Sequence, residues 1–320
     1  MFKVIMAPTE GSDSEKAAIS VAVKLAQRFD ADLRLVRVVT TPLIVQTMAQ
    51  MPELITEQVL LDERLASLRK LEALGTECGA LGGIKVMTAL EDGPVAPTLR
   101  QHAMEHNVDL IVMSSHSRGG VKRIVLGSAT DYLIRHTNIP VVVVRPPVSI
   151  TAAPEEMFNR ILVPLDGSAL AEQILPKVVA LASRLNATIC LLQVLTPKTY
   201  SQKEIMQPAL PWWDADIASA DACLARASRY LTEEGLTVSR ETVLSEDVAT
   251  AIIDYSMRTR ADLIALATSG SGGLSRMVFG AVADAVTRTS TRSLLVFHPK
   301  SPVAVASAGT QSAEKTLAGA

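Results

Sequence analysis

The chain alternates short apolar runs with amphipathic stretches. Its first apolar run, FKVIMAP, is ended by a proline and the polar segment TEGSDSE. The stretch SEKAAISVAVKLAQRF then has apolar positions at the three- and four-residue spacing of a helix, for which Ser12 or Asp13 is a suitable N-cap. The same alternation continues, and it predicts strands near 2–8, 32–39, 84–90, 109–115 and 140–146 and helices near 14–29, 52–78, 95–106 and 128–136.

The second half of the chain repeats this order of elements. It predicts strands near 160–168, 187–195, 237–244, 262–268 and 293–299 and helices near 169–185, 214–234, 248–257 and 281–289. Strands that are apolar on both faces and alternate with helices are typical of a parallel sheet covered by helices on both sides. Each half is therefore predicted to be a five-stranded, Rossmann-like α/β domain with a parallel sheet.

The length of the chain fits two such domains, because 320 residues allow two units of about 150 residues each. We place the first domain at 1–146 and the second at 159–299. The proline-containing segment 147–158 is predicted to be a linker. The small and polar segment 300–320 is predicted to be a disordered tail.

Composition narrows the choice of partner and compartment. With 48% hydrophobic residues and a net charge of -2, the chain has ample core and no charge excess to attract nucleic acid or an anionic membrane. The cysteines Cys78, Cys190 and Cys223 lack zinc-site spacing and are expected to be buried thiols in a reducing compartment. No leader and no membrane-spanning apolar run is recognised. We therefore expect a cytoplasmic protein without a metal site.

A glycine-spaced loop occurs twice, in HSRGGVKRIVLGSATD and SGGLSRMVFGAVADAV, with Gly127 aligned to Gly280 and Asp131 to Asp284. In an open parallel sheet, ligands bind beyond the carboxyl ends of the strands, where these loops are expected to lie. Small residues before a helix N-terminus suit a phosphate group, although a tight connection without a ligand also favours glycine. The phosphate-binding pattern GxxxxGK[ST] is absent.

These residues make each half similar to a universal stress protein domain, and the chain resembles a tandem member of that family. The similar segments are VIMAPTEGS and ILVPLDGS, and the block DLIVMSSHSRGGVKRIVLGSATDYLIRHTNIPVVVV with its counterpart DLIALATSGSGGLSRMVFGAVADAVTRTSTRSLLVF. The resemblance implies an adenine nucleotide α-hydrolase-like fold that binds ATP or a related adenine nucleotide. The residues that it assigns to this site are Pro8, Thr9, Glu10, Val38, Ser114, His116, Ser117, Arg118, Gly119, Gly127, Ser128, Pro164, Asp166, Val194, Ala267, Gly270, Gly280 and Ala281.

Both halves depart from the nucleotide-binding pattern of that family, which is Gly, two residues, Gly, nine residues, and Gly followed by Ser or Thr. The first half has Ser, Ser, Gly and Ser at these positions, and the second has Ala, Gly, Gly and Ala. The hydroxyl of Ser128 favours the first half for phosphate, because a hydrogen bond to a charged acceptor is worth about 1.5–3 kcal/mol. Asp166 favours the second half, because the resemblance places an aspartate against adenosine, where Glu10 is one methylene longer. On balance we expect ATP to contact the first half more tightly.

Other residues of chemical interest have plain structural interpretations beside the functional ones. His102 and His106 are spaced for a shared metal, but they are better interpreted as a solvated helix face. His116 either contacts the nucleotide or is simply exposed. Trp212 and Trp213 are expected to lie in a long loop and to pack it onto the domain, or else to form a partner site.

The function that these features favour is a cytoplasmic stress-response protein that binds an adenine nucleotide as a regulatory signal, without efficient turnover. No catalytic set of residues is recognised. The alternatives are a nucleotide-free interaction scaffold and a slow ATP-hydrolysing enzyme. The two domains are expected to pack as an internal pseudo-dimer, and two chains could form a homodimer. The apolar strands VVVV at 141–144 and LLVF at 294–297 are predicted to lie at the edge of each sheet and to pair with each other or with another chain.

Overall fold

The computed structural model describes most of the chain. The described residues are 2–12, 15–40, 57–115, 126–145, 157–197, 211–268 and 280–299. The segments 147–156 and 300–320, which were predicted to be linker and tail, lie outside the described residues. Met157 and Phe158, at the end of the predicted linker, are buried in the core. No helix of the described part of the chain is long and apolar enough to cross a membrane.

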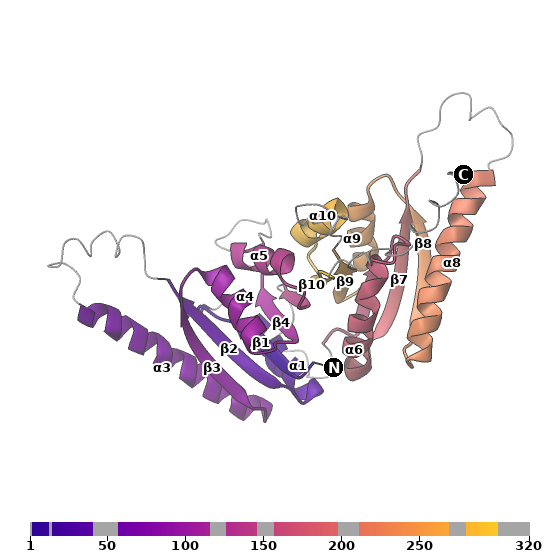
Figure 1. Ribbon diagram of the computed structural model, residues 1–320. Helices are drawn as coiled ribbons and strands as arrows, with labels where there is room; N and C mark the ends of the chain where they lie inside the picture. The colour runs from indigo at the N-terminus through magenta and orange to yellow at the C-terminus, as the bar shows by residue number, and fades with distance from the viewer. Residues whose placement is uncertain are drawn as a thin grey trace, which may run out of the picture.

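One ten-stranded sheet runs through both halves, in the order β3-β2-β1-β4-β5-β10-β9-β6-β7-β8 (Figure 1). Within each half the strands are parallel, as their apolar runs predict. The strands of the first half are β1 (Val4–Pro8), β2 (Asp32–Val39), β3 (Val86–Asp92), β4 (Leu110–Ser114) and β5 (Val141–Val144). Those of the second half are β6 (Arg160–Pro164), β7 (Thr188–Leu195), β8 (Val238–Leu244), β9 (Leu263–Ala267) and β10 (Ser293–Phe297).

The two halves join where β5 pairs with β10, the one antiparallel pair among the described strands. Leu295 lies opposite Val142, and neither side chain is exposed to solvent. An uncovered strand edge made of valine and leucine favours aggregation, and this pairing covers both edges at once. The prediction that these two strands pair with each other is therefore confirmed.

Helices cover both faces of the sheet. One face carries α1, α3, α6 and α8, and the other carries α4, α5, α9 and α10 (Figure 1). The helices of the first half are α1 (Lys16–Phe29), α3 (Glu57–Gly82), α4 (Val95–Glu105) and α5 (Ser128–His136). In the second half a short 3-10 helix, η2 (Ala171–Ile174), precedes α6 (Leu175–Leu185), α8 (Pro211–Glu233), α9 (Val248–Arg258) and α10 (Ala281–Thr289).

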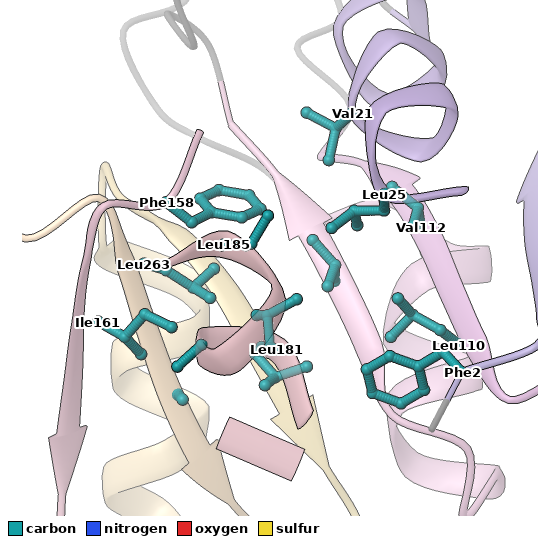
Figure 2. Packing of buried hydrophobic residues seen from close by; sticks show 14 of the residues in the cluster. Phe2, Val21, Leu25, Leu110, Val112, Phe158, Ile161, Leu181, Leu185 and Leu263 are labelled. Carbon is teal, nitrogen blue, oxygen red and sulfur yellow. The ribbon is translucent and has the colours of Figure 1, made fainter. Parts of the chain in front are cut away.

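Each face has one apolar core that continues from one half into the other. Figure 2 shows residues of the larger core, to which the first half contributes Leu25 of α1 and the second half contributes Leu181 of α6. Side chains alternate between the two cores along the joined strands, so that Val142 enters one core and Val143 the other. The halves therefore share their hydrophobic interior.

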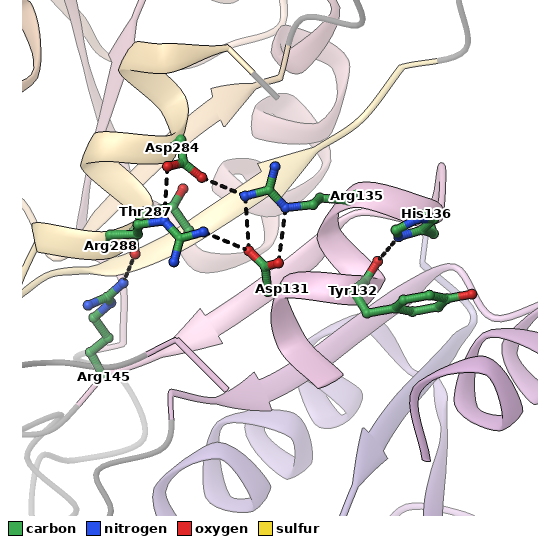
Figure 3. A network of polar contacts seen from close by, with 8 residues as sticks. All are labelled: Asp131, Tyr132, Arg135, His136, Arg145, Asp284, Thr287 and Arg288. Atoms are coloured by element: carbon green, nitrogen blue, oxygen red, sulfur yellow. Dashed lines mark hydrogen bonds and ion pairs between the residues drawn. The ribbon is translucent and has the colours of Figure 1, made fainter. Parts of the chain in front are cut away.

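A ring of four charged side chains also crosses the junction (Figure 3). Each of the helices α5 and α10 contributes an aspartate from its first turn and an arginine from its last turn. Arg135 donates to Asp131 of its own helix at 3.0 Å and to Asp284 of the other half at 2.5 Å. Arg288 donates to Asp284 at 2.9 Å and to Asp131 at 3.4 Å. The two arginines lower the pKa of Asp284 against the opposing effect of its burial. The ring has the same residues in both halves, which the aligned loop already indicated for the two aspartates.

Three details differ from the sequence predictions. Helix α8 begins at Pro211, so Trp212 and Trp213 lie in its first turn and not in a loop. A proline in the first turn of a helix is favourable, and it starts this helix earlier than expected. Helix α3, Glu57–Gly82, ends four residues after the predicted end at 78, and its predicted start at 52–56 lies outside the described residues. The residue at the N-cap of α1 is Glu15, whereas Ser12 or Asp13 was expected, and its side chain makes the contacts described below.

Candidate functional site

The candidate sites lie where the strand order reverses in each half. The strand β1 lies between β2 and β4, and β6 lies between β7 and β9. The loop after β1 and the loop after β4 therefore lead to opposite faces of the sheet, and so do the loops after β6 and β9. This arrangement opens a crevice beyond the carboxyl ends of the central strands. Both crevices hold a cavity, and the two cavities differ greatly in size.

The cavity of the second half has a volume of about 280 Å³. Its walls are apolar, and Asp166 is the one ionisable side chain among the described residues that line it. The lining residues are Pro164, Leu165, Asp166, Ser168, Leu170, Ala171, Val194, Val248, Ile252, Leu266, Ala267, Gly280, Ala281, Val282, Ala283 and Val286. Small-molecule pockets typically measure about 300–1,000 Å³ and combine apolar walls with a few polar groups. The volume of this cavity is close to the lower limit of that range.

The loop after β6 forms one wall of this cavity and is held by its own side chains. The backbone N–H of Ser168 donates to Oδ1 of Asp166 at 2.9 Å, and the Ser168 hydroxyl accepts from the N–H of Ala171 at 3.1 Å. Gly167 has a φ of 83°, which strongly favours glycine at this turn. The loop therefore presents the exposed Asp166 side chain beside the cavity.

The start of α10 forms the opposite wall. Gly280 is the N-cap residue, with φ -57° and ψ 139°, and no side chain caps the helix. The first N–H groups of a helix have no partner inside it, and they carry the positive end of the helix dipole. Ala281, Val282 and Ala283 belong to this first turn and line the cavity. The wall can therefore bind an anionic group through its backbone.

The cavity of the first half is only about 30 Å³ in volume, although its position is the same. It is lined by Pro8, Thr9, Glu10, Glu15, Val36, Val38, Val95, Leu99, Met113, Ser114 and Ala129. The carboxylate of Glu15 lies in the loop after β1, where it accepts hydrogen bonds from the Thr9 hydroxyl at 2.8 Å and from the backbone N–H of Glu10 at 2.9 Å. The described residues of this half therefore form the same site with little open volume.

The residues expected from the sequence fall into four groups. Pro8, Thr9, Glu10, Val38 and Ser114 line the small cavity. Pro164, Asp166, Val194, Ala267, Gly280 and Ala281 line the large cavity. Gly127 caps α5 and Ser128 begins it, but neither lines a cavity that the described residues form. His116, Ser117, Arg118, Gly119 and Gly270 lie outside the described residues.

Sequence reasoning missed several residues that line the two cavities. Glu15 was treated only as part of a helix, although it lies a few residues after a loop of small and polar residues. The apolar wall of the large cavity includes Val248, Ile252, Val282 and Val286, which the sequence analysis placed in helices without assigning them to a site. Their spacing on the two helices is the signal that could have found them, because each pair is four residues apart and shares one face.

His102 corrects the prediction of a solvated helix face, because it is only 3% exposed while His106 is exposed. Its Nδ1 lies 2.7 Å from a carboxylate oxygen of Glu91, and its Nε2 lies 3.4 Å from the guanidinium of Arg34. A neutral imidazole satisfies both partners, by donating to Glu91 and accepting from Arg34. Burial lowers the pKa of His102, and the hydrogen bond to Glu91 opposes this effect. The described residues contain no group of three or more side chains that could hold a metal.

The fold and the site together define a class of protein: a duplicated α/β protein of the doubly wound type, with a ligand crevice at the switch point of each half. Comparison with known proteins then identifies the family. The model of the universal stress protein family matches residues 1–145 and again 157–298. The chain therefore belongs to the universal stress protein family and carries its domain twice.

Relatives share either one domain or nearly the whole chain. A universal stress protein of Methanocaldococcus jannaschii is 31% identical over 147 residues, which are 46% of this chain and 84% of the relative. One of Mycolicibacterium smegmatis is 23% identical over 300 residues, which are 92% of this chain and 97% of the relative. The crystal structure of a universal stress protein from Archaeoglobus fulgidus has a TM-score of 0.66 at 17% identity, and covers 93% of this chain and 98% of that chain. At this identity the structural likeness shows the fold.

Proposed function

We propose that this chain is a cytoplasmic stress-response protein whose second half binds ATP or a related adenine nucleotide as a regulatory signal. The observation that carries the proposal is the cavity of about 280 Å³ between the loop after β6 and the start of α10. Its apolar walls suit a base and a sugar, and the first turn of α10 suits a phosphate. The three free and buried cysteines agree with a reducing compartment.

The choice of the second half differs from the expectation stated in the sequence analysis, which favoured the first half. Ser128 supplies a hydroxyl in the first half, which is worth about 1.5–3 kcal/mol against a charged phosphate. That gain requires room for the ligand, and the described residues of the first half enclose a cavity of only about 30 Å³. Available volume therefore outweighs a single hydrogen bond, and we place the nucleotide beside Asp166.

Regulatory binding is favoured over turnover by the chemistry of the lining. Hydrolysis of a phosphate ester needs groups that position the nucleophile and neutralise the transferred phosphoryl group, often with metal ions. Asp166 is the one ionisable side chain among the described lining residues, and it lies on the loop wall opposite the α10 N-terminus. Bound nucleotide would then act by stabilising one conformation of the loop and helix.

Calorimetry on two matched variants tests the proposal. Gly280→Glu and Gly127→Glu each place a bulky, negatively charged side chain at a helix start, and both positions have negative φ that a non-glycine residue tolerates. We expect wild type and Gly127→Glu to bind nucleotide, and Gly280→Glu to lose binding. Mass spectrometry of the purified wild type should also find co-purifying adenine nucleotide.

The other outcomes separate the alternatives. Loss of binding in Gly127→Glu alone would place the site in the first half. No binding by wild type would favour a scaffold that acts through protein contacts. Turnover of ATP at a rate of about 1 s⁻¹ or more would favour an enzyme, because such rates are common for catalysts of phosphoryl transfer.

A further inference from the structure

The loop after β1 holds a carboxylate that belongs to the chain itself. Both oxygens of Glu15 accept from the backbone N–H of Glu10, at 3.0 and 2.9 Å. One of them also accepts from the Thr9 hydroxyl at 2.8 Å and from the N–H of Gly11 at 3.2 Å. Glu15 is 5% exposed and lies among the residues that line the small cavity. Three donors of one loop thus surround one buried anion.

The second half has the same loop without this carboxylate. Pro8 and Pro164 begin the two loops, and Gly11 and Gly167 adopt similar positive φ values of 81° and 83°. The residue seven positions after the proline is Glu15 in the first half and Ala171 in the second.

Ala171 lines the large cavity, as Glu15 lines the small one. A glutamate side chain is larger than an alanine methyl by one methylene and the three heavy atoms of a carboxylate. This difference has the sign needed to explain why one cavity measures about 30 Å³ and the other about 280 Å³.

Ordinary helix capping does not account for the contacts of Glu15. It stands at the N-cap of α1, where a negative charge is favourable, but its side chain makes no capping hydrogen bond to that helix. Its hydrogen bonds go back to the loop that precedes it. The backbone N–H groups of Glu10 and Gly11 point in one direction, which is the geometry by which successive peptide groups bind an anion.

We propose that the loop after β1 is an anion-binding loop that Glu15 fills, and that Glu15 thereby closes the ligand site of the first half. The residue at this position then decides which half of the chain is open to a ligand. Removing the carboxylate should leave a loop that accepts a small carboxylate from solution, and should open a second site for the ligand class of the second half. The last of these points rests on the proposed nucleotide binding, and the others do not.

The first test is chemical rescue with formate, measured as the thermal unfolding midpoint. Glu15→Ala should lower the midpoint, because the Thr9 hydroxyl and the Glu10 N–H lose the carboxylate that accepts from them, and formate should reverse most of that loss. Glu15→Gln is the matched control: it keeps the volume of the side chain, so formate has no space to enter and should not rescue it. Sodium chloride at the same ionic strength controls for screening. Failure of formate to rescue Glu15→Ala would overturn the proposal.

The second test counts bound ATP by calorimetry in Glu15→Ala and Ala171→Glu. We expect one nucleotide for wild type, two for Glu15→Ala, and at least a tenfold loss of affinity for Ala171→Glu. A count of one for Glu15→Ala would overturn the claim that Glu15 alone closes the first site. Ala171→Glu keeps the inference testable if Glu15→Ala does not fold, because Ala171 is only partly buried and unchanged affinity there would contradict the role of this position.

The two proposals can fail separately. Absence of ATP binding in wild type and in both variants would overturn the proposed function. The formate experiment would then decide the role of Glu15 by itself, since it requires no nucleotide.

Discussion

Replacing Leu295 by alanine should destabilise both halves of the chain together. Leu295 lies in the middle of β10, is fully buried, and faces Val142 across the junction. Truncation of a buried leucine to alanine costs 2–5 kcal/mol, depending on how far the surroundings collapse. Because β10 is held by strands on both sides, collapse is limited here, and we expect about 3 kcal/mol, or roughly a 100-fold change in the unfolding equilibrium.

The three buried cysteines report on the two halves separately. Cys78 lies in α3 of the first half, and Cys190 and Cys223 lie in the second. Burial raises the pKa of the Cys78 and Cys223 thiols, which keeps them unreactive in the folded protein. Pulse labelling of each thiol across a urea series, read by mass spectrometry, therefore gives an unfolding midpoint for each half.

We expect all three midpoints of Leu295→Ala to fall by about 1 M urea, for a dependence of about 3 kcal/mol per molar urea in a chain of this size. The reason is that each hydrophobic core includes residues of both halves. A matched control is Leu81→Ala, which removes the same atoms from a side chain that is 73% exposed and should move no midpoint. If the midpoint of Cys190 falls while that of Cys78 stays in place, the halves unfold independently and the reasoning is wrong.

Three further predictions concern the charged and titratable groups. Burial lowers the pKa of His102 and of His298 below the ordinary 6.5, so the unfolded chain binds protons more readily than the folded chain. The free energy of unfolding should therefore decline as the pH falls below about 6.5. Urea midpoints at about pH 7.5 and pH 5.5 measure this decline, and it should be smaller in a variant with both histidines replaced by glutamine. Arg145→Met should leave the free energy of unfolding in urea unchanged or raise it by about 1 kcal/mol. The reason is that the Arg145 guanidinium is buried and its Nε and Nη1 have no hydrogen-bond partner among the described residues. A loss of several kcal/mol would contradict this reasoning. A double-mutant cycle between Arg135 and Asp284 should give a coupling of about 0.5–1 kcal/mol that weakens in 1 M salt, and zero coupling at low salt would remove the pair from the account of the junction.

The fold could be predicted closely from the sequence, because its elements are decided by local patterns. The run VVVV of β5 is buried at all four positions, and the helix predicted at 281–289 is found at those residues. Errors occur where two local signals compete. At 211–214 the sequence PWWD indicates both a loop and the first turn of a helix, and the structure has the helix.

Burial of a polar residue was the harder quantity to predict. His102 carries a polar ring, but it shares a helix face with Leu99 and Ala103 and is drawn into the core with them. Its partners Glu91 and Arg34 lie on the strands β3 and β2, and only the folded sheet brings them together. The space in each candidate site was unpredictable for the same reason, since Glu15 closes one cavity through contacts with a loop that precedes it.

The two halves have equivalent residues at the junction where they meet, and they differ in the crevices where a ligand would bind. At the junction the aspartate and the arginine of each helix have the same partners in the opposite half, as Asp131 and Asp284 show. A residue in this ring contacts both halves, so changing one member leaves a charge without its partner in each helix. In the crevices each half can change alone, and a glutamate in place of an alanine alters one cavity without touching the other. A duplicated chain can therefore keep two equivalent domains for its stability while the described residues of one crevice leave more open volume than those of the other.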